Sequence, residues 1–240
     1  MTSAPAVPTS RSKELLIEEQ IRKWQLANER RRKSEPRPTI TISREMGSRG
    51  TALGRKIAET LGFDFFDREI IQAVAESMQM SEQVVASLDE RMRSSLEHWI
   101  QILKSTRFLW PDKYRQHLTK VVGAIAEHGS VVIMGRGANY LLPEEETLRV
   151  RFVGSLAYRV DIVAERENIS KEEAERRVRK SDEERQAYVK DHFAFDINDP
   201  SYFDLIINTE YLTAETIVKI VASSLKFKKH PARRRFDEKE

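Results

Sequence analysis

A glycine-containing turn at residues 43–51 has the residue types that bind phosphate groups. Its sequence is SREMGSRGT, in which Gly47 and Gly50 would let the backbone approach an anion closely. A helix that begins after such a turn directs free N–H groups and the positive end of its dipole toward that anion. Two glycines in a turn of this kind are also typical of an ordinary structural turn, so both interpretations stay open at this point.

Cationic and hydroxyl side chains accompany these glycines. Arg44 and Arg49 carry guanidinium groups, which can donate paired hydrogen bonds to phosphate oxygens. The hydroxyl of Thr51 can cap the following helix or bind Mg²⁺. The turn has no Lys-Ser or Lys-Thr pair after its glycines, although standard phosphate-binding loops carry one.

A second candidate is Arg136, which lies between two glycines in the segment MGRGAN at residues 134–139. Glycines on both sides suit a guanidinium that must reach an anion without crowding. The alternative is a tight turn with a surface arginine.

The third candidate is the arginine-rich segment RRVRKSDEERQAY at residues 176–188. Such a run is typical of a solvated helix face with i,i+3 and i,i+4 salt bridges. Taken together, however, the three segments contain the parts of a phosphoryl-transfer kinase. That reaction depends on positioning and charge neutralisation more than on a strong base, and a closing segment keeps water out.

Short apolar strands alternate with helices along the middle of the chain. Strands are expected at residues 39–43, 63–66, 130–134, 148–153 and 204–208. Helices are expected at residues 51–61 with Gly62 as C-cap, from 67 to about 78, from Ser81 as N-cap, over most of 82–129 with a break near Trp110 and Pro111, at 155–167, from 171 to about 191 after a Ser170–Glu173 capping box, and at 213–225. The alternation predicts an α/β fold with a five-stranded parallel sheet and helices on both faces. Ligands bind such sheets beyond the carboxyl ends of the strands, where we expect the three candidate segments to fall.

A separate amphipathic helix is expected from Ser12, as N-cap, to Lys33. Its apolar residues are Leu15, Leu16, Ile21, Trp24 and Leu26. This stripe is narrow, so we expect it to pack on the core or on a second subunit, the latter giving a homo-oligomer. The segment EPRP at residues 35–38 ends the helix and forms a linker.

The composition excludes several kinds of site. The chain has no cysteine, so disulfides and thiolate metal sites are excluded, and its five histidines are scattered without ligand spacing. No signal-like or membrane-spanning apolar run is present, so a soluble cytoplasmic protein is expected. Residues 1–38 hold nine Lys/Arg against five Asp/Glu, and residues 226–240 hold seven against three. We expect these basic ends to be solvated and do not expect nucleic acid as a partner.

Between about Pro38 and Leu225 the chain resembles the cytidylate kinase-like family of P-loop proteins, which are related to nucleoside monophosphate kinases. The blocks that carry the resemblance, in order, are ITISREMGSRGTALGRKIAETLG, FFDREII, VVIMGRGANYLL, AERENISKEEAERRVRKSDEERQAYVKDHF and DPSYFDLIINTE.

The resemblance implies a P-loop kinase-like three-layer domain at 38–225, with a helical acceptor-side insertion at 82–129 and a lid at 168–199. Residues 1–37 would be a basic extension and 226–240 a basic tail. It implies ATP and Mg²⁺ as cofactors and a nucleoside monophosphate, with CMP as the candidate, as acceptor. The donor phosphates would bind Gly47, Ser48, Arg49, Gly50 and Thr51, with Thr51 also at the metal. The acceptor would bind Asp67, Arg68 and Arg136, and the catalytic arginines would be Arg44, Arg136, Arg179 and Arg185.

Two departures from the family pattern concern the reaction itself. Alignment without gaps from Asp67 puts Gly50 where true kinases carry the P-loop lysine, so Arg44 or Arg49 would have to replace it. Gly137 follows Arg136 where true cytidylate kinases place an aspartate. The first departure leaves a non-catalytic nucleotide-binding or sensing protein as the alternative. A third interpretation is an interaction protein whose basic tails bind nucleic acid or membrane while the core only supports them.

Arg179 and Arg185 are six residues apart, so they cannot share one face of a helix. If both bind the same phosphates, the helix must end or bend between them, and Ser181-Asp182 is the expected place. The segment from about residue 180 to 199 should then be the most mobile part of the core without nucleotide.

Overall fold

The structure is a computed structural model that describes residues 10–30, 38–105 and 113–227. Residues 1–9 and 31–37 of the N-terminal basic end, nearly all of the C-terminal one, and the predicted break at Trp110 and Pro111 lie outside these residues. The chain divides into two compact units. We name residues 38–67 and 130–240 the sheet unit, and residues 1–37 and 68–129 the helical unit.

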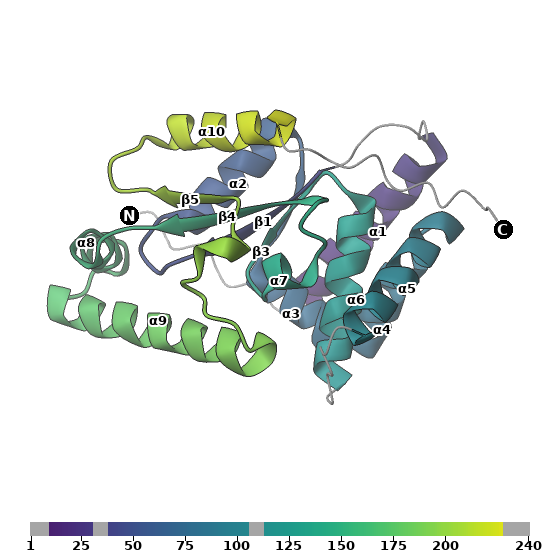
Figure 1. Cartoon of the computed structure of the whole chain (residues 1–240), viewed down its shortest axis with the longest axis horizontal. Helices are drawn as coiled ribbons and strands as arrows, with labels where there is room; N and C mark the ends of the chain where they lie inside the picture. Colours follow the sequence, from purple (N-terminus) through teal and green to yellow (C-terminus); the bar gives the residue numbers. More distant parts are fainter. Residues whose placement is uncertain (1–9, 31–37, 106–112, 228–240) are drawn as a thin grey trace. The chain divides into compact units, whose positions relative to one another are not determined.

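The sheet unit contains one five-stranded parallel sheet (Figure 1). Its strands are β1 (Thr39–Arg44), β2 (Asp64–Phe66), β3 (Val131–Met134), β4 (Thr147–Val153) and β5 (Leu205–Asn208), in the spatial order β2-β3-β1-β4-β5. All four strand pairs are parallel. The predicted α/β fold with a five-stranded parallel sheet is therefore confirmed, and β1 lies in the centre, so the loop after it opens at the middle of the carboxyl edge.

Two helices pack on one face of this sheet: α2 (Gly50–Leu61) and α10 (Ala214–Phe227). Ile57 of α2 and Ile217 of α10 are fully buried against apolar strand residues such as Ile42 and Phe152. α2 ends as predicted at Gly62, whose left-handed backbone and N–H bonds to the carbonyls of Ala58 and Glu59 close the helix.

The remaining helices of the sheet unit follow β3 and β4. They are α7 (Ala138–Leu141), α8 (Leu156–Glu167), α9 (Lys171–Phe193) and the short 3₁₀ helix η1 (Pro200–Tyr202). α8 and α9 pack together through Val160, Val163, Ala174 and Val178. The hydroxyl of Ser170 accepts from the N–H of Glu173, so the predicted cap of α9 is present. α7 and η1 are not among the predicted helices, because both are too short to show a helical period.

The helical unit comprises α1 (Ser10–Arg30), α3 (Arg68–Glu76), α4 (Met78–Ala86), α5 (Glu90–Ser105) and α6 (Lys113–His128). Two predicted N-caps here are wrong. α1 begins at Ser10, so Ser12 lies inside it, and α4 is capped by Ser77, whose hydroxyl accepts from the N–H of Met80. Ser81 is instead a buried residue within α4, because the helical turn that Ser77 caps starts before it.

α1 packs within the helical unit through two of its apolar residues. Ile17 and Trp24 are buried, and the Trp24 ring stacks on His128 with ring centroids 3.9 Å apart. Because positions 17 and 24 are two turns apart, they share a face that the predicted stripe only partly included. Leu15, Leu16 and Leu26 are exposed, and a second subunit at this surface stays a prediction. Among the described residues, no helix has the length and apolar character that a membrane crossing requires.

Candidate phosphate-binding site

The loop between β1 and α2 has the backbone shape of an anion cradle. Gly47 and Arg49 both adopt left-handed conformations, with φ of 85° and 55°, and α2 starts directly afterwards at Gly50. Among the described residues, no backbone acceptor takes the N–H groups of Gly47, Arg49, Gly50 or Thr51. The loop therefore offers free donors at a helix N-terminus, where an anion is also favoured by the helix dipole.

Close contact with α8 explains why residue 47 is a glycine. A β-carbon at Gly47 would lie 2.4 Å from the carbonyl oxygen of Arg159, and its φ is unfavourable for any other residue. The loop therefore lies directly on the first turn of α8, and this contact fixes its position relative to β4.

Gly50 is the residue that the resemblance implies for the lysine position, and the side chain of Arg44 lies against it. A β-carbon at Gly50 would lie 2.6 Å from Cβ of Arg44 and 3.0 Å from its Cγ. The φ of Gly50 is not positive, so the crowding alone excludes a side chain there. The space that a side chain at position 50 would need is therefore occupied by the stem of Arg44.

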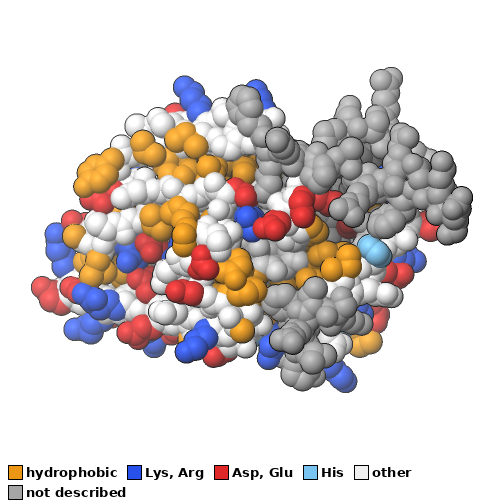
Figure 2. Space-filling model, viewed as in Figure 1, with side chains coloured by type: hydrophobic (Ala, Val, Ile, Leu, Met, Phe, Trp, Pro, Cys, Tyr) orange, Lys and Arg blue, Asp and Glu red, His pale blue; other side chains and the backbone are white. Residues whose placement is uncertain are grey.

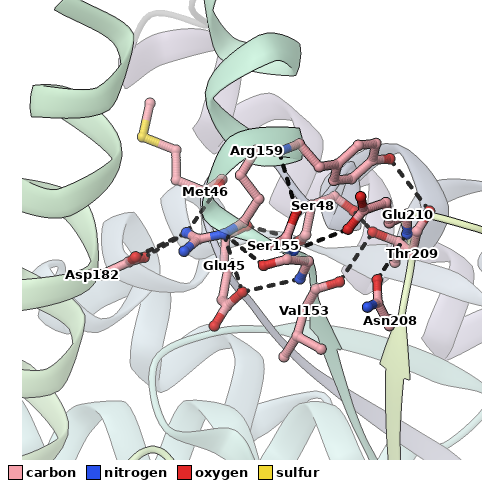
Figure 3. A network of polar contacts seen from close by, with 12 residues as sticks. Glu45, Met46, Ser48, Val153, Ser155, Arg159, Asp182, Asn208, Thr209 and Glu210 are labelled. Carbon is pink, nitrogen blue, oxygen red and sulfur yellow. Dashed lines mark hydrogen bonds and ion pairs between the residues drawn. The ribbon is translucent and has the colours of Figure 1, made fainter. Parts of the chain in front are cut away.

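The side chains of Arg49 and Ser48 contact the protein rather than the cradle. Arg49 donates to the carbonyl of Thr209 at 3.0 Å, and its guanidinium lies 5.8 Å from the centre of the Tyr158 ring. The Ser48 hydroxyl donates to the carbonyl of Glu45, and the Ser48 carbonyl accepts from the Thr209 hydroxyl. The two bonds to Thr209 tie the loop to the segment after β5, and Figure 3 shows Ser48 beside Thr209.

Four charged side chains that the sequence analysis did not select meet beside the loop. They are Glu45, Arg151, Arg159 and Asp182, from the loop, β4, α8 and α9. Figure 3 shows the carboxylates of Glu45 and Asp182 directed at Arg159 from two sides. The sequence LRVRFV contains one signal for this cluster. Its arginines alternate with apolar residues in a buried strand, so they require polar partners nearby.

Arg151 is almost completely buried at the carboxyl end of β4. Its guanidinium donates to the hydroxyl of Ser43 at 3.3 Å and to the amide oxygen of Asn198 at 3.2 Å. One nitrogen lies 3.6 Å from the Glu45 carboxylate. Burial lowers the pKa of Arg151 from its ordinary value, and the charge of Glu45 opposes that shift. The cationic guanidinium of Arg151 is therefore held at the carboxyl end of β4, beside the loop.

Arg136 has a strained backbone and an aromatic neighbour. Gly135, Arg136 and Gly137 are three consecutive left-handed residues, with φ of 77°, 54° and 68°. The Arg136 guanidinium lies 5.4 Å from the centre of the Tyr188 ring on α9. A β-carbon at Gly137 would lie 2.2 Å from the Phe193 ring. A side chain at position 137 would therefore meet this aromatic ring of α9.

α9 is continuous from Lys171 to Phe193, so the helix does not bend at Ser181-Asp182 in this structure. Arg179 pairs with Glu175 on an exposed face, whereas Arg185 donates to the Ser181 hydroxyl at 2.6 Å. The two arginines are therefore not brought together. Figure 2 shows basic and acidic side chains intermingled in the part of the surface where α8 and α9 lie, as expected for a solvated face.

The other predicted residues lie in two units. Thr51 is exposed in the first turn of α2, and Asp67 accepts a bond from Arg55 at 2.9 Å. Arg68 is the first residue of α3 and belongs to the helical unit. Among the described residues, no group of three or more His, Cys, Asp or Glu side chains could hold a metal ion.

Comparison with known proteins agrees with this arrangement. The family model described as the cytidylate kinase-like family matches residues 39–211. The chain belongs to this family. A protein of Pyrococcus horikoshii named cytidylate kinase is 30% identical over 186 residues, which cover 78% of this chain and 87% of that protein. A cytidylate kinase of Methanothrix thermoacetophila is 29% identical over 171 residues, or 71% and 87%.

One solved structure is similar in fold to this chain. It is the crystal structure of an uncharacterized protein from Eubacterium ventriosum, with a TM-score of 0.56 and 19% identity. The match covers 79% of this chain and 98% of that one.

Proposed function

We propose that this chain transfers a phosphoryl group from ATP, with Mg²⁺, to a nucleoside monophosphate, and that CMP is the first candidate acceptor. Membership of the cytidylate kinase-like family supports this class of reaction. The observation that carries the proposal is the loop after β1, which presents free N–H groups at a helix N-terminus with arginines beside it.

Arg44 replaces the missing lysine in this proposal. Its side chain starts from the end of β1 and lies against Gly50, the position that aligns with the lysine. Arg49 is the weaker candidate because its bond to the Thr209 carbonyl directs its guanidinium toward the segment after β5. A guanidinium offers several donors to phosphate oxygens, so it can neutralise the charge that lysine would, although with a different geometry.

The residues of the loop fit a magnesium nucleotide. Mg²⁺ keeps several waters and usually takes few protein ligands besides the nucleotide phosphates, and the exposed hydroxyl of Thr51 would be one of them. When bound, Mg²⁺ neutralises negative charge on the phosphate oxygens. The chain itself binds the donor phosphates through the loop N–H groups, orients them with Arg44, and supplies further positive charge from Arg159.

The acceptor would present its phosphate to Arg136. The two flanking glycines hold this arginine in a left-handed turn, and Tyr188 stacks beside its guanidinium. The Phe193 ring lies in the space beside Gly137, and residue 137 has no carboxylate that could bind the acceptor base.

The test is an ADP-release assay with each of the common nucleoside monophosphates, with ATP binding measured in parallel by calorimetry. We expect ATP-dependent release that CMP stimulates. ATP binding without release for any acceptor would favour the alternative, a non-catalytic nucleotide-binding or sensing protein. No ATP binding at all would contradict both and leave the interaction-protein reading.

A further inference from the structure

Arg159 is shared by two carboxylates that come from different parts of the sheet unit. Its Nε lies 3.3 Å from Oε2 of Glu45, and one terminal nitrogen lies 2.8 and 3.1 Å from the two carboxylate oxygens of Asp182. Figure 3 shows this arginine between the loop and α9. The Arg159 side chain is only 8% exposed, so both contacts form in a largely dehydrated setting.

Glu45 is an unusual residue for a phosphate-binding loop, because a carboxylate repels phosphate. Its charge is held away from the cradle by specific bonds: Oε2 accepts from the N–H of Gly154 at 3.1 Å, and Oε1 lies 3.6 Å from Arg151. The backbone N–H of Glu45 also bonds the carbonyl of Phe152. Glu45 is therefore anchored to β4 by both its backbone and its side chain.

Asp182 is held much less firmly. It lies in the middle of α9, its side chain is 35% exposed, and its short contacts are with the single nitrogen of Arg159. Arg185 approaches it only to 4.0 Å. The contact between Asp182 and Arg159 can break without any rearrangement of β1, β4 or the loop.

Arg159 also lies within reach of the cradle. The nitrogen that contacts Asp182 lies 3.4 Å from the carbonyl oxygen of Met46 in the loop, and the backbone of Arg159 lies directly against Gly47. A phosphate on the loop N–H groups would therefore compete with Asp182 for this nitrogen. A carboxylate and a phosphate present similar acceptor oxygens to a guanidinium, which makes the exchange chemically reasonable.

We propose that Asp182 is an internal substitute for phosphate on Arg159, displaced when nucleotide binds, and that Glu45 is a positioning residue that keeps Arg159 in place. This inference rests on the proposed function of the loop. It makes the ion pair between Asp182 and Arg159 depend on nucleotide, so that ATP binding would release the middle of α9 from Arg159 while the apolar packing of α8 on α9 remains.

The two carboxylates should give effects of opposite sign. General electrostatics predicts that removing either negative charge beside a phosphate site tightens ATP binding. Asp182→Asn keeps the shape of the side chain and removes the negative charge that competes with phosphate for Arg159. We expect this variant to bind ATP about fivefold more tightly. Glu45→Gln should instead weaken binding by about fivefold, because loss of the anchor outweighs the loss of repulsion.

The experiment measures ATP affinity of the full chain by calorimetry for these two variants, for Asp182→Ala as a second form of the first, and for Glu175→Gln as a matched control. Glu175 lies on the same helix but pairs with Arg179 on an exposed face, so its variant should bind like the unmodified chain. Thermal melting identifies any variant that fails to fold. Hydrogen exchange of α9 should also rise on ATP addition in the unmodified chain and change little in Asp182→Asn.

Failure of the Asp182 and Glu45 roles can be distinguished from failure of ATP binding itself. If both Asp182 variants bind ATP as the unmodified chain does or more weakly, the internal-substitute role is wrong while ATP binding stands. If Glu45→Gln tightens binding, its effect is only general electrostatics and the positioning role is wrong. If no form of the chain binds ATP, the proposed function fails and this inference fails with it.

Discussion

The side chain of Arg44 begins where a side chain on Gly50 would begin, since a β-carbon on Gly50 would lie 2.6 Å from Cβ of Arg44. Only one of the two positions can therefore carry a side chain in this loop. The family resemblance implies that an arginine replaces the lysine, and a lysine introduced at position 50 would meet the stem of Arg44.

Gly50→Lys alone should destabilise the chain, because the added side chain meets the stem of Arg44. We expect a loss of about 1–3 kcal/mol in the free energy of unfolding, the usual scale of overpacking. The double variant Arg44→Ala with Gly50→Lys should recover most of that loss, and its ATP affinity should exceed that of Arg44→Ala alone. Chemical denaturation and calorimetry measure the two quantities; equal losses in the single and double variants would show that the two side chains do not compete.

Arg44→Ala by itself should weaken ATP binding by about 1.5–3 kcal/mol, the scale of a charge-assisted hydrogen bond. Arg49→Ala is the matched comparison, since it lies in the same loop but bonds the carbonyl of Thr209. We expect this second variant to lower the melting temperature more than the ATP affinity. The opposite ranking in calorimetry would mean that Arg49 is the arginine that replaces the lysine.

Much of the fold could be predicted because its signals are local. The strands VVIM and LRVRFV are short and apolar on at least one face, and Gly62 and Ser170 end and begin helices by their own backbone and side-chain chemistry. Errors occurred where several residues of one type compete. Ser77 and Ser81 can both cap a helix, and only tertiary packing, which buries Ser81, decides between them.

The site was harder to predict because its partners are distant in the sequence. Glu45 and Asp182 share Arg159, yet 114 and 23 residues separate them from it, and no local period connects such positions. Gly137 shows the same limit. Its departure from the family pattern was visible in the sequence, but the reason, a ring from Phe193 in the adjacent space, depends on how the end of α9 packs.

Gly137→Ala should be strongly destabilising for two separable reasons. The residue has a φ of 68°, and a β-carbon would meet the Phe193 ring. We expect a loss of about 2–4 kcal/mol from the left-handed backbone and the overpacking together. In a Phe193→Leu background the same change should cost less, because only the backbone term remains. Denaturation of the four chains of this cycle gives the coupling, and strict additivity would exclude the contact.

Tyr188 should position Arg136 through its ring rather than its hydroxyl. The guanidinium lies 5.4 Å from the ring centre, a cation–π distance worth about 0.5–2 kcal/mol. Tyr188→Phe keeps the ring face and should leave the half-saturating acceptor concentration nearly unchanged, whereas Tyr188→Leu should raise it several-fold with little change at saturation. Steady-state assays over a range of acceptor concentrations measure both. Equal effects of the two variants would mean that the hydroxyl, or packing alone, matters.

The two predicted lid arginines should behave differently, because continuous α9 holds them on different faces. Arg179 pairs with Glu175 at a position that is mostly exposed, so Arg179→Ala should change nucleotide binding little. Arg185 is more buried, bonds Ser181, and lies on the side of Asp182, so Arg185→Ala should weaken binding of a bisubstrate analogue.

Calorimetry compares the two variants, and hydrogen exchange over residues 180–199 with and without the analogue reports whether this segment orders. If Arg179→Ala has the larger effect and the segment becomes protected, α9 must bend between the two arginines when ligand binds. If neither variant matters and exchange is unchanged while binding is measured, the arginines of α9 form a solvated face and the segment takes no part in closing the site.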